Sequence, residues 1–481
     1  MLNSSYAVAQ KDKMLSVRQL RHDYAEVLKF IEAYPDPYSH ISESDFKSKC
    51  DSIQATLIEP LTRLEFYKKV SNVVALLKDG HSSVYLPKFW MTKQHNEYGA
   101  LPMEFHLAND DKLYVLKSHG YDSIPPGAQI LSINGLSIAN FLKIIDPFVS
   151  YELKQFRNTV IDDDLEKYLY LVFNHSDSTV FEFLTDKKYV KVVRNVPVKQ
   201  WKGMVKDEMG EREKQMAMLE PYSFEKVADG IGLLKIYSFS TNRYQSYELF
   251  LEKTFRHIRK EEIHSLILDV RGNYGGWPKM ASALFHYISE SHFKTFALSE
   301  MKVSEPFKKK YLDVDAGLRY VNFGPSKRHY IDIESIMNNP VNSYLKEELI
   351  YNEEPNIEEE EFQGECYLLT NRDSYSAASS FASTFQCYNM GLIIGEETGG
   401  TKVFRANPIY KTLNNSGINL AMATTKFYTT CFDEEFKGIS PHILFTPTIF
   451  QLISGMDAQL EYTKYLIQKI QRDREKAILE N

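Results

Sequence analysis

The sequence lacks several patterns, and each absence narrows the possible functions. No apolar run approaches the roughly 18–20 residues that a membrane-spanning helix needs. The 4 cysteines form no Cys-x-x-Cys pair, which argues against a zinc site or a thioredoxin-like motif and leaves open whether any two of them pair. No Gly-x-x-x-x-Gly-Lys-Ser/Thr motif is present, so a phosphate-binding loop is a poor fit. The net charge of −7 gives no reason to expect nucleic acid as a partner.

What is present is the composition of a globular protein of several domains. The chain has 481 residues, more than one ordinary domain holds, and we expect about two to four domains. Hydrophobic residues make up 43% and charged residues 25%, while 31 Tyr and 29 Phe predict cores and clefts rich in rings. Ala7-Val8-Ala9-Gln10 resembles the end of a signal peptide, but no apolar segment precedes it. We therefore expect either a cytoplasmic chain or a numbering that starts inside a longer precursor.

Changes in residue pattern along the chain predict four regions. Apolar residues at helical spacing predict a helical N-terminal region over residues 1–95, which ends in the turn Asp79-Gly80-His81. Residues 97–198 carry strand patterns and an Asn-Gly turn signal, with a helical insert. The charged, Met-rich stretch 199–222 is expected to be a linker. From 223 to 481 strands alternate with helices, apart from a less regular insertion at about 291–362, which predicts a layered α/β core.

The segment Asn371–Ala382 stands between a predicted buried strand, Cys366–Thr370, and a predicted helix, Ala377–Met390. A hydroxyl at this position lies beside free backbone N–H groups and the positive end of the helix dipole, which suits a nucleophilic serine. Serine also caps helices for structural reasons, and the segment alone favours that ordinary interpretation. The choice depends on whether partners for the serine exist elsewhere in the chain.

Three other segments carry residues that could act with such a serine. A predicted buried strand is followed by Gly275-Gly276, where two glycines let the backbone turn tightly and direct N–H groups at an oxyanion. His81 follows a tight Asp-Gly turn, and histidine can accept a proton from serine near neutral pH. The carboxylates of Glu434-Glu435 could orient such a base. Taken singly, each segment is explained as well by an ordinary turn or a charged loop.

Together these segments resemble peptidase family S41. This family of serine peptidases includes the C-terminal processing (tail-specific) proteases, the tricorn protease core and the interphotoreceptor retinoid-binding proteins. The resemblance covers about residues 75–445 and follows the family's order: Asp-Gly-His, a PDZ-like I-L-S-I-N-G, L-I-L-D-V-R-G-N-Y-G-G, Ser-Ala after a strand, G-E-E-T-G-G and E-F-K-G-I-S-P. It implies an α/β multidomain protein with a ClpP/crotonase-like core from about 223 onward, a PDZ-like β-rich domain over 97–198 and a helical N-terminal region.

The resemblance implies a nucleophile and its oxyanion donors. Ser376 corresponds to the family's serine, in Ser374-Tyr-Ser-Ala377. The donors correspond to the backbone N–H groups of Ala377 and of the pair Gly275-Gly276, with Gly275 preferred. Ser380 stands where Glu is common in the family, and Gly127-Ala128 stands where the PDZ signature has Gly-Asp.

The resemblance also implies a base, for which the family has two schemes. The tricorn-like branch uses His with a supporting Glu, which correspond here to His81 and Glu435, with Glu434 as the rival carboxylate. That branch also uses a second serine, for which Ser82 is a candidate. The tail-specific branch uses a Ser-Lys dyad, and Lys402 stands one residue after the family's lysine position. We favour the His81 scheme and keep Lys402 as the alternative.

The function implied is hydrolysis of peptide bonds through a serine acyl-enzyme, with no metal and no organic cofactor. The implied partner is a polypeptide, held in part by its C-terminus if the PDZ-like groove binds peptide, and the family favours a periplasmic or secreted location. Two other classes remain: a non-catalytic ligand- or peptide-binding protein on the same fold, and a crotonase-type acyl-CoA enzyme. An intact Ser/His/Glu set argues against the first, and a serine at a helix start beside a PDZ-like module argues against the second.

Overall fold

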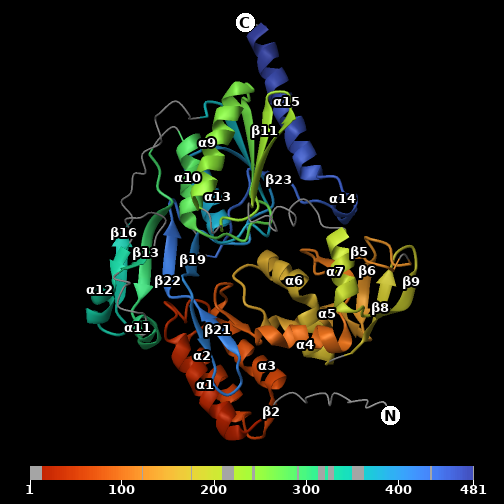
Figure 1. The fold of residues 1–481 in the computed structure, drawn as a ribbon, viewed down its shortest axis with the longest axis vertical. Coiled ribbons are helices and arrows are strands. Elements are labelled where there is room, and N and C mark those ends of the chain that lie inside the picture. The colour runs from red at the N-terminus through yellow and green to blue at the C-terminus, as the bar shows by residue number, and fades with distance from the viewer. Residues whose placement is uncertain are drawn as a thin grey trace, which may run out of the picture.

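The computed structural model describes residues 14–121, 123–174, 176–207, 221–240, 244–289, 292–312, 320–322, 330–348, 362–433 and 436–479. It is a mixed α/β structure in several parts: a layered α/β unit, an antiparallel-sheet unit beside it and a group of N-terminal helices (Figure 1). Across these ranges we find no helix with both the length and the apolar character that crossing a membrane requires.

The layered unit is built on a sheet with the strand order β10-β11-β12-β17-β18-β23. Its strands are β10 (Tyr222–Ala228), β11 (Ile231–Ile236), β12 (Ser265–Asp269), β17 (Glu365–Thr370), β18 (Gly391–Gly395) and β23 (Ile443–Leu444). The edge strand β10 is antiparallel to β11, and the other pairs are parallel. Parallel strands covered on both faces have nearly continuous apolar sequences, and every residue of β12 is buried.

Helices cover both faces of this sheet (Figure 1). On one face lie α9 (Tyr244–Lys260), α10 (Pro278–Ile288) and α13 (Ala377–Cys387), and on the other lies α15 (Ala458–Leu479). Side chains alternate between the two cores, so that Leu268 packs under the first group of helices and Ile267 packs towards α15. Since parallel strands share one carboxyl edge, the loops after β12 and β17 meet at the same end of the sheet.

A second, antiparallel sheet has the order β16-β13-β22-β19. Its strands are β13 (Phe296–Lys302), β16 (Tyr344–Glu348), β19 (Val403–Ala406) and β22 (Thr425–Thr429). The predicted insertion at about 291–362 therefore contributes two strands to a sheet completed by distant parts of the chain. Between those two strands lie α11 (Glu305–Leu312), β14 (Tyr320–Asn322), β15 (Tyr330–Asp332) and α12 (Ile333–Asn338).

The antiparallel-sheet unit has the order β4-β5-β6-β8-β9, with β7 paired to β6. Its elements are α4 (Lys88–Tyr98), β4 (Met103–Leu107), β5 (Leu113–Ser118), β6 (Gln129–Ile133), β7 (Leu136–Ser137), α5 (Ile138–Ile145), η2 (Asp146–Phe148), α6 (Lys154–Phe173), β8 (Ser178–Leu184) and β9 (Lys188–Arg194). The expected linker at 199–222 begins in a helix, α7 (Val198–Asp207). Residues 208–220 of that stretch lie outside the described ranges.

The N-terminal helices are joined to the C-terminal half of the chain by a small sheet. The helical elements are α1 (Val17–Ile31), α2 (Glu43–Ala55), α3 (Arg63–Val74) and η1 (Ala75–Leu77), with a strand pair β1 (Met14–Leu15) and β2 (Leu61–Thr62). β3 (Ser83–Tyr85) pairs with β21 (Asn419–Met422), which pairs with β20 (Ile409–Thr412). A short helix, α14 (Ile449–Ile453), precedes α15. This pairing brings the turn at 78–82 to the layered unit.

Candidate active site

Ser376 lies at the sharp turn between β17 and α13, where it caps the helix. Its backbone has φ 53° and ψ −118°, a left-handed conformation that a residue with a side chain rarely adopts. Such strain costs on the order of 1–3 kcal/mol and is characteristic of functional sites. A strained strand-to-helix turn of this kind exposes the Oγ of a nucleophilic serine.

His81 meets this serine from the turn between η1 and β3. The distance from His81 Nε2 to Ser376 Oγ is 3.0 Å, and the two residues are 295 positions apart in the chain. Other hydroxyls of the serine segment are bonded elsewhere: Ser374 Oγ donates to the Val270 carbonyl, and the Oγ atoms of Ser379 and Ser380 donate to the Ser376 carbonyl. Among these serines, Ser376 is the one whose hydroxyl contacts the His81 ring.

The other ring nitrogen of His81 faces a buried polar cluster. Tyr375 Oη lies 2.9 Å from Nδ1 and also 2.8 Å from Glu152 Oε1. The nearest carboxylate oxygens, from Asp79 and Glu152, lie 3.6 and 3.8 Å from Nδ1. Both distances exceed hydrogen-bond length, so the tyrosine hydroxyl is the direct partner of Nδ1.

Aromatic rings fix the plane of this cluster. The Tyr375 ring stacks between His81, with ring centroids 4.8 Å apart, and Phe156, with centroids 3.9 Å apart. Gly80 allows this packing, because a Cβ there would lie 2.6 Å from Tyr375 Oη and 2.9 Å from the Phe156 ring. The glycine of the Asp-Gly-His motif is therefore required by the close approach of the tyrosine.

Burial and charge determine the protonation of the base. The side chains of Asp79 and Glu152 are 0% and 3% exposed, and that of His81 is 14% exposed. Burial alone would lower the pKa of His81, but the carboxylates of Asp79 and Glu152 outweigh it and raise that pKa to about 9. Burial raises the pKa of Glu152, and His81 partly offsets this.

The loop after β12 passes directly beside Ser376. A Cβ on Gly275 would lie 2.7 Å from Ser376 Cβ and 2.8 Å from the Ala377 nitrogen, so only glycine fits. The N–H of Gly275 donates to Asn273 Oδ1 at 2.8 Å, and its carbonyl accepts from the Phe239 N–H. Because a trans peptide points N–H and C=O in opposite directions, the N–H of Gly276 points away from Phe239. Among the described residues, neither Gly276 nor Ala377 has an acceptor for its N–H.

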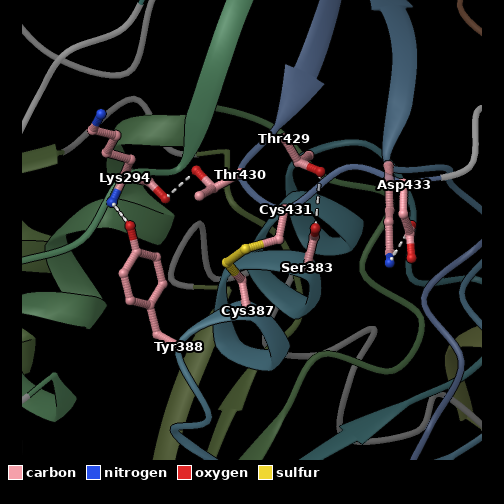
Figure 2. The surroundings of a disulfide bond; sticks show 9 residues. Lys294, Ser383, Cys387, Tyr388, Thr429, Thr430, Cys431 and Asp433 are labelled. Carbon is pink, nitrogen blue, oxygen red and sulfur yellow. Dashed lines mark hydrogen bonds and ion pairs between the residues drawn. A yellow bond between two sulfur atoms is a disulfide. The ribbon is translucent and has the colours of Figure 1, made fainter.

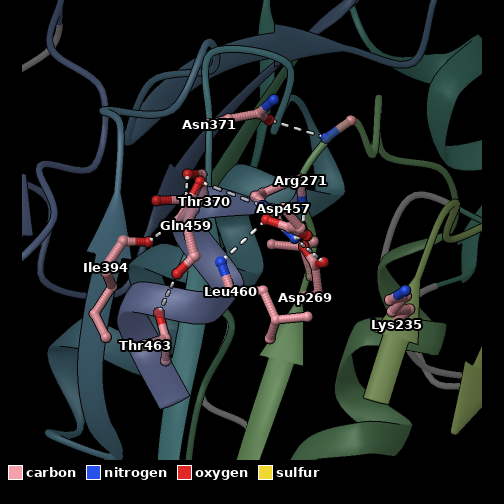
Figure 3. A network of polar contacts seen from close by, with 12 residues as sticks. Lys235, Asp269, Arg271, Thr370, Asn371, Ile394, Asp457, Gln459, Leu460 and Thr463 are labelled. Carbon is pink, nitrogen blue, oxygen red and sulfur yellow. Dashed lines mark hydrogen bonds and ion pairs between the residues drawn. The ribbon is translucent and has the colours of Figure 1, made fainter. Parts of the chain in front are cut away.

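A polar network holds this loop to the start of α15 (Figure 3). The Arg271 guanidinium contacts both oxygens of Asp269 and both oxygens of Asp457 at 2.6–2.9 Å. These carboxylates outweigh burial and raise the pKa of Arg271. The Gly272 N–H donates to Asn371 Oδ1 at 2.9 Å, which ties the loop to the serine segment.

The other predicted site residues have different surroundings. Ser82 is fully buried, and its Oγ donates to Asp79 at 2.5 Å and accepts from the Ala423 N–H, so it holds Asp79 rather than Ser376. Lys402 Nζ forms an ion pair with Asp433 at 2.7 Å. Glu434 and Glu435 lie outside the described residues.

A disulfide joins α13 to the loop after β22 (Figure 2). It links Cys387, at the end of the helix that Ser376 begins, to Cys431, while Cys50 and Cys366 are buried and take no part in a disulfide. The sequence left this pairing open. Ser383 and Thr429 reinforce the junction with a hydrogen bond of 2.9 Å.

Sequence reasoning missed Glu152 and Tyr375. Glu152 comes from the antiparallel-sheet unit, between η2 and α6, and no local pattern distinguishes it from other surface-type glutamates. Tyr375 stands inside the serine motif, and its position beside Ser376 was the available signal. Donor atoms of Asp79, His81 and Glu152 lie within 4.8 Å of one another, a spacing that a metal ion could use. We assign them to the hydrogen-bonded surroundings of His81, in which they are already engaged.

One family model and several solved structures are similar to this chain. The model of peptidase family S41 matches residues 230–445. Mature CPAF is similar over 94% of this chain and 96% of that chain, with 14% identity and a TM-score of 0.63. CPAF complexed with lactacystin is similar over 94% of this chain and 98% of that chain, with 13% identity and a TM-score of 0.62.

A putative peptidase from Parabacteroides merdae covers 94% of this chain and 96% of its own, with 16% identity and a TM-score of 0.47. The search of curated proteins found no match. At these identities the structural likeness concerns the fold, and the family match carries the classification. Residues 230–445, somewhat less than half of the chain, match peptidase family S41, and this match supports a serine peptidase, a hydrolase.

Proposed function

We propose that the chain hydrolyses peptide bonds in polypeptides through an acyl-enzyme on Ser376, with His81 as the base. The observation that carries this proposal is the 3.0 Å contact between His81 Nε2 and Ser376 Oγ, made at a strained helix start. In the first step His81 takes the proton of Ser376 as its Oγ attacks the carbonyl carbon. His81 then gives that proton to the departing amine, and water, activated by the same base, releases the acid.

We assign the oxyanion donors to the backbone N–H groups of Gly276 and Ala377. Ala377 follows Ser376 in the chain, and Gly276 follows Gly275, which packs against Ser376. Neither N–H has an acceptor among the described residues, whereas the Gly275 N–H is already bonded to Asn273. The assignment therefore moves from Gly275, which the family resemblance favoured, to Gly276. Two such donors stabilise the negative charge that develops on the carbonyl oxygen during acyl transfer.

The parts of the fold suggest how a polypeptide reaches this site. We assign the layered unit to a ClpP/crotonase-like core and the β4–β9 unit to a PDZ-like domain. The β6–β7 hairpin with its Asn134-Gly135 turn supports the second assignment. A PDZ-like groove would add an extended peptide as a further strand, which is consistent with a polypeptide substrate.

Replacement of Ser376 by alanine tests the nucleophile. Ser376→Ala should abolish peptide hydrolysis and covalent labelling by a fluorophosphonate, because no other described hydroxyl contacts His81 Nε2, and should leave the circular dichroism spectrum unchanged. Ser380→Ala is the matched control on the same helix and should remain labelled, since it loses only a bond to the helix backbone. Labelling that persists in Ser376→Ala would overturn the proposal.

Separate replacements of Lys402 and His81 decide between the two bases. Lys402→Met should keep most of the activity, because the Lys402 ammonium is paired with Asp433. His81→Ala should reduce kcat on the order of 10²- to 10⁴-fold, which is the usual contribution of a general base. Rates at saturating peptide measure both effects. Loss of activity in Lys402→Met, with activity kept in His81→Ala, would establish a Ser-Lys dyad.

A further inference from the structure

We infer that Glu152, acting through the hydroxyl of Tyr375, is the carboxylate that orients the base His81. The inference rests on the proposed role of His81 and adds a positioning residue from a different part of the fold. Tyr375 Oη lies 2.8 and 3.0 Å from the two Glu152 oxygens and 2.9 Å from His81 Nδ1. The three groups form an unbroken chain that ends at Ser376.

The directions of these hydrogen bonds follow from counting protons. An ionised carboxylate can only accept, so the single O–H of Tyr375 donates to Glu152. The Tyr375 oxygen must then accept from His81, which places a proton on Nδ1. In neutral His81 this leaves Nε2 unprotonated and able to accept the proton of Ser376. Glu152 thus selects the one His81 tautomer that can act as a base, and it does so through two hydrogen bonds, by way of Tyr375.

Loss of the Glu152 charge would remove this selection. A neutral acid or amide at position 152 can donate to Tyr375, whose O–H is then free to turn towards His81 Nδ1. That arrangement favours the tautomer protonated at Nε2, which cannot accept from Ser376. The ground-state contacts would all remain, but the base would hold its proton on the wrong nitrogen.

Asp79 is less suited to this role, although it is the nearer carboxylate. Its Oδ1 accepts the backbone N–H of His81 at 3.1 Å, and its Oδ2 accepts Ser82 Oγ at 2.5 Å. These bonds shape the turn, and Oδ1 remains 3.6 Å from Nδ1. Asp79 contributes charge to the His81 ring, whereas Glu152 also controls the proton positions.

The position of Glu152 is fixed against the serine segment. The helix that follows it, α6, is tied to that segment by Thr159, whose Oγ1 donates to Asp373 Oδ1 at 2.6 Å. Gln155 Nε2 donates to the Thr398 carbonyl at 3.2 Å. These hydrogen bonds therefore fix the position of the Glu152 carboxylate relative to Ser376, although the two residues come from different units of the fold.

Other charged groups also face this cluster and set the background of any pH measurement. Burial raises the pKa of Tyr34, and the charges of Asp79, Arg405, Asp36 and Glu152 act on it as well. On its outer side Glu152 borders a cavity of about 530 Å³ that His40, Lys49 and Lys78 also line. These groups are unchanged in the variants below, so differences between variants report on the Glu152–Tyr375–His81 chain.

The test compares Glu152→Gln and Tyr375→Phe with Glu166→Gln in the full-length chain. Glu166, on the helix α6 that follows Glu152, also contacts a histidine and a tyrosine, His95 at 2.9 Å and Tyr170 at 3.1 Å, and is a matched control outside the site. We expect Glu152→Gln and Tyr375→Phe each to lower kcat roughly a hundredfold or more, with KM nearly unchanged. The double variant should be no slower than the slower single variant, because both residues act through one chain.

Two further readouts separate orientation from simple structural damage. Removing the Glu152 charge should shift the acidic limb of the rate profile to lower pH while lowering its plateau, because His81 loses a carboxylate that raises its pKa. Nitrogen NMR of labelled histidine, with no substrate present, should show Nδ1-protonated His81 at high pH in the wild type and a mixture in Glu152→Gln. An unchanged pH profile and tautomer in Glu152→Gln would overturn the inference, as would a mixed tautomer in the wild type.

Failure of the proposed function would look different. It would appear as absent fluorophosphonate labelling of Ser376 in the wild type, whereas the NMR readout depends only on the geometry around His81. If Glu152→Gln does not fold, Tyr375→Phe, which removes one oxygen atom, takes its place in the kcat and tautomer measurements with the same expected results. Its acidic limb should stay close to the wild-type position, because the Glu152 charge remains.

Discussion

His81 carries its proton more tightly than an ordinary histidine, and this should appear in the pH dependence of the reaction. Burial opposes its charge, but Asp79 and Glu152 outweigh burial and bring the pKa to about 9. The base must be neutral to act, so kcat/KM should rise about tenfold per pH unit and level off near pH 9. A profile measured with a peptide substrate between pH 6 and 10 checks this, and a plateau already at pH 7 would contradict it.

Protonation of the His81 imidazole should also make the stability of the folded state depend on pH. Because the folded-state pKa lies above the ordinary value of 6.5, the charged imidazolium stabilises the fold at pH values below 6.5. This contribution should be lost as the pH rises from 6.5 to about 9. The midpoint of urea unfolding, compared between wild type and His81→Ala across that range, measures it: the difference should shrink as pH rises.

Gly80 is the residue at which the smallest change should have a large effect. A methyl group there would meet Tyr375 Oη and the Phe156 ring, both held in a packed stack. Gly80→Ala should therefore displace Tyr375, lower activity at least tenfold and cost about 1–3 kcal/mol of unfolding free energy, as overpacking does. Peptide turnover and thermal unfolding measure the two effects, and wild-type values of both in Gly80→Ala would show that the Tyr375 stack accommodates the methyl group.

At the scale of elements, α13 has a constraint at each end: the strained turn at Ser376 and the disulfide at Cys387. Ser376 starts the helix, and the Cys387–Cys431 disulfide closes a loop with a sequence separation of 44 residues at its other end. The Cys387→Ser/Cys431→Ser double variant should lose about 4 kcal/mol of unfolding free energy by the loop-entropy relation. Thermal unfolding with and without a reductant measures this loss. If the wild type and the double variant unfold at the same temperature, and the reductant does not change the wild-type value, the disulfide does not stabilise the fold.

Sequence patterns predicted the core elements well, because buried parallel strands have continuous apolar sequences. Strand β17 and helix α13 both appear close to their expected residues. The same patterns failed where long-range pairing decides the structure. The irregular stretch from 291 contains β13, which is a strand because β22 pairs with it from more than 120 residues away.

The site, too, contains residues that sequence patterns predict and residues that only the folded structure reveals. Ser376, His81 and the paired glycines stand in motifs whose turn geometry the sequence reveals, and the structure brings them together. Glu152 could not be found from the sequence, because its role comes from burial behind Tyr375 rather than from any spacing. The donor assignment within Gly275-Gly276 depended on the Asn273 side chain, which only the folded loop shows.

At the scale of the whole molecule, Arg372 connects the antiparallel-sheet unit to the serine segment. It is buried, with its guanidinium donating to the Leu107 carbonyl and paired with Asp162. Arg372→Met leaves Asp162 buried without its partner, which should cost about 3–5 kcal/mol and loosen the docking of the two units. Unfolding measurements and small-angle scattering test this, and Asp162→Asn combined with Arg372→Met should recover part of the stability.

The location of the chain remains a proposal at this scale. A disulfide between Cys387 and Cys431 suits an oxidising compartment, since cytosolic conditions keep thiols reduced. We propose a periplasmic or secreted location on this ground and on the family resemblance. Alkylation of free thiols in the purified native protein should modify neither Cys387 nor Cys431.

The distance of 295 residues between base and nucleophile has a consequence for synthesis. A ribosome releases His81 early and Ser376 late, and the strand that seats the His81 turn, β21, comes later still. A partial chain that ends before β21 lacks the strand with which β3 pairs beside the His81 turn, and one that ends before Ser376 also lacks the serine. On the proposed mechanism, the dispersal of the site along the chain therefore delays assembly of the catalytic pair until most of the chain has been synthesised.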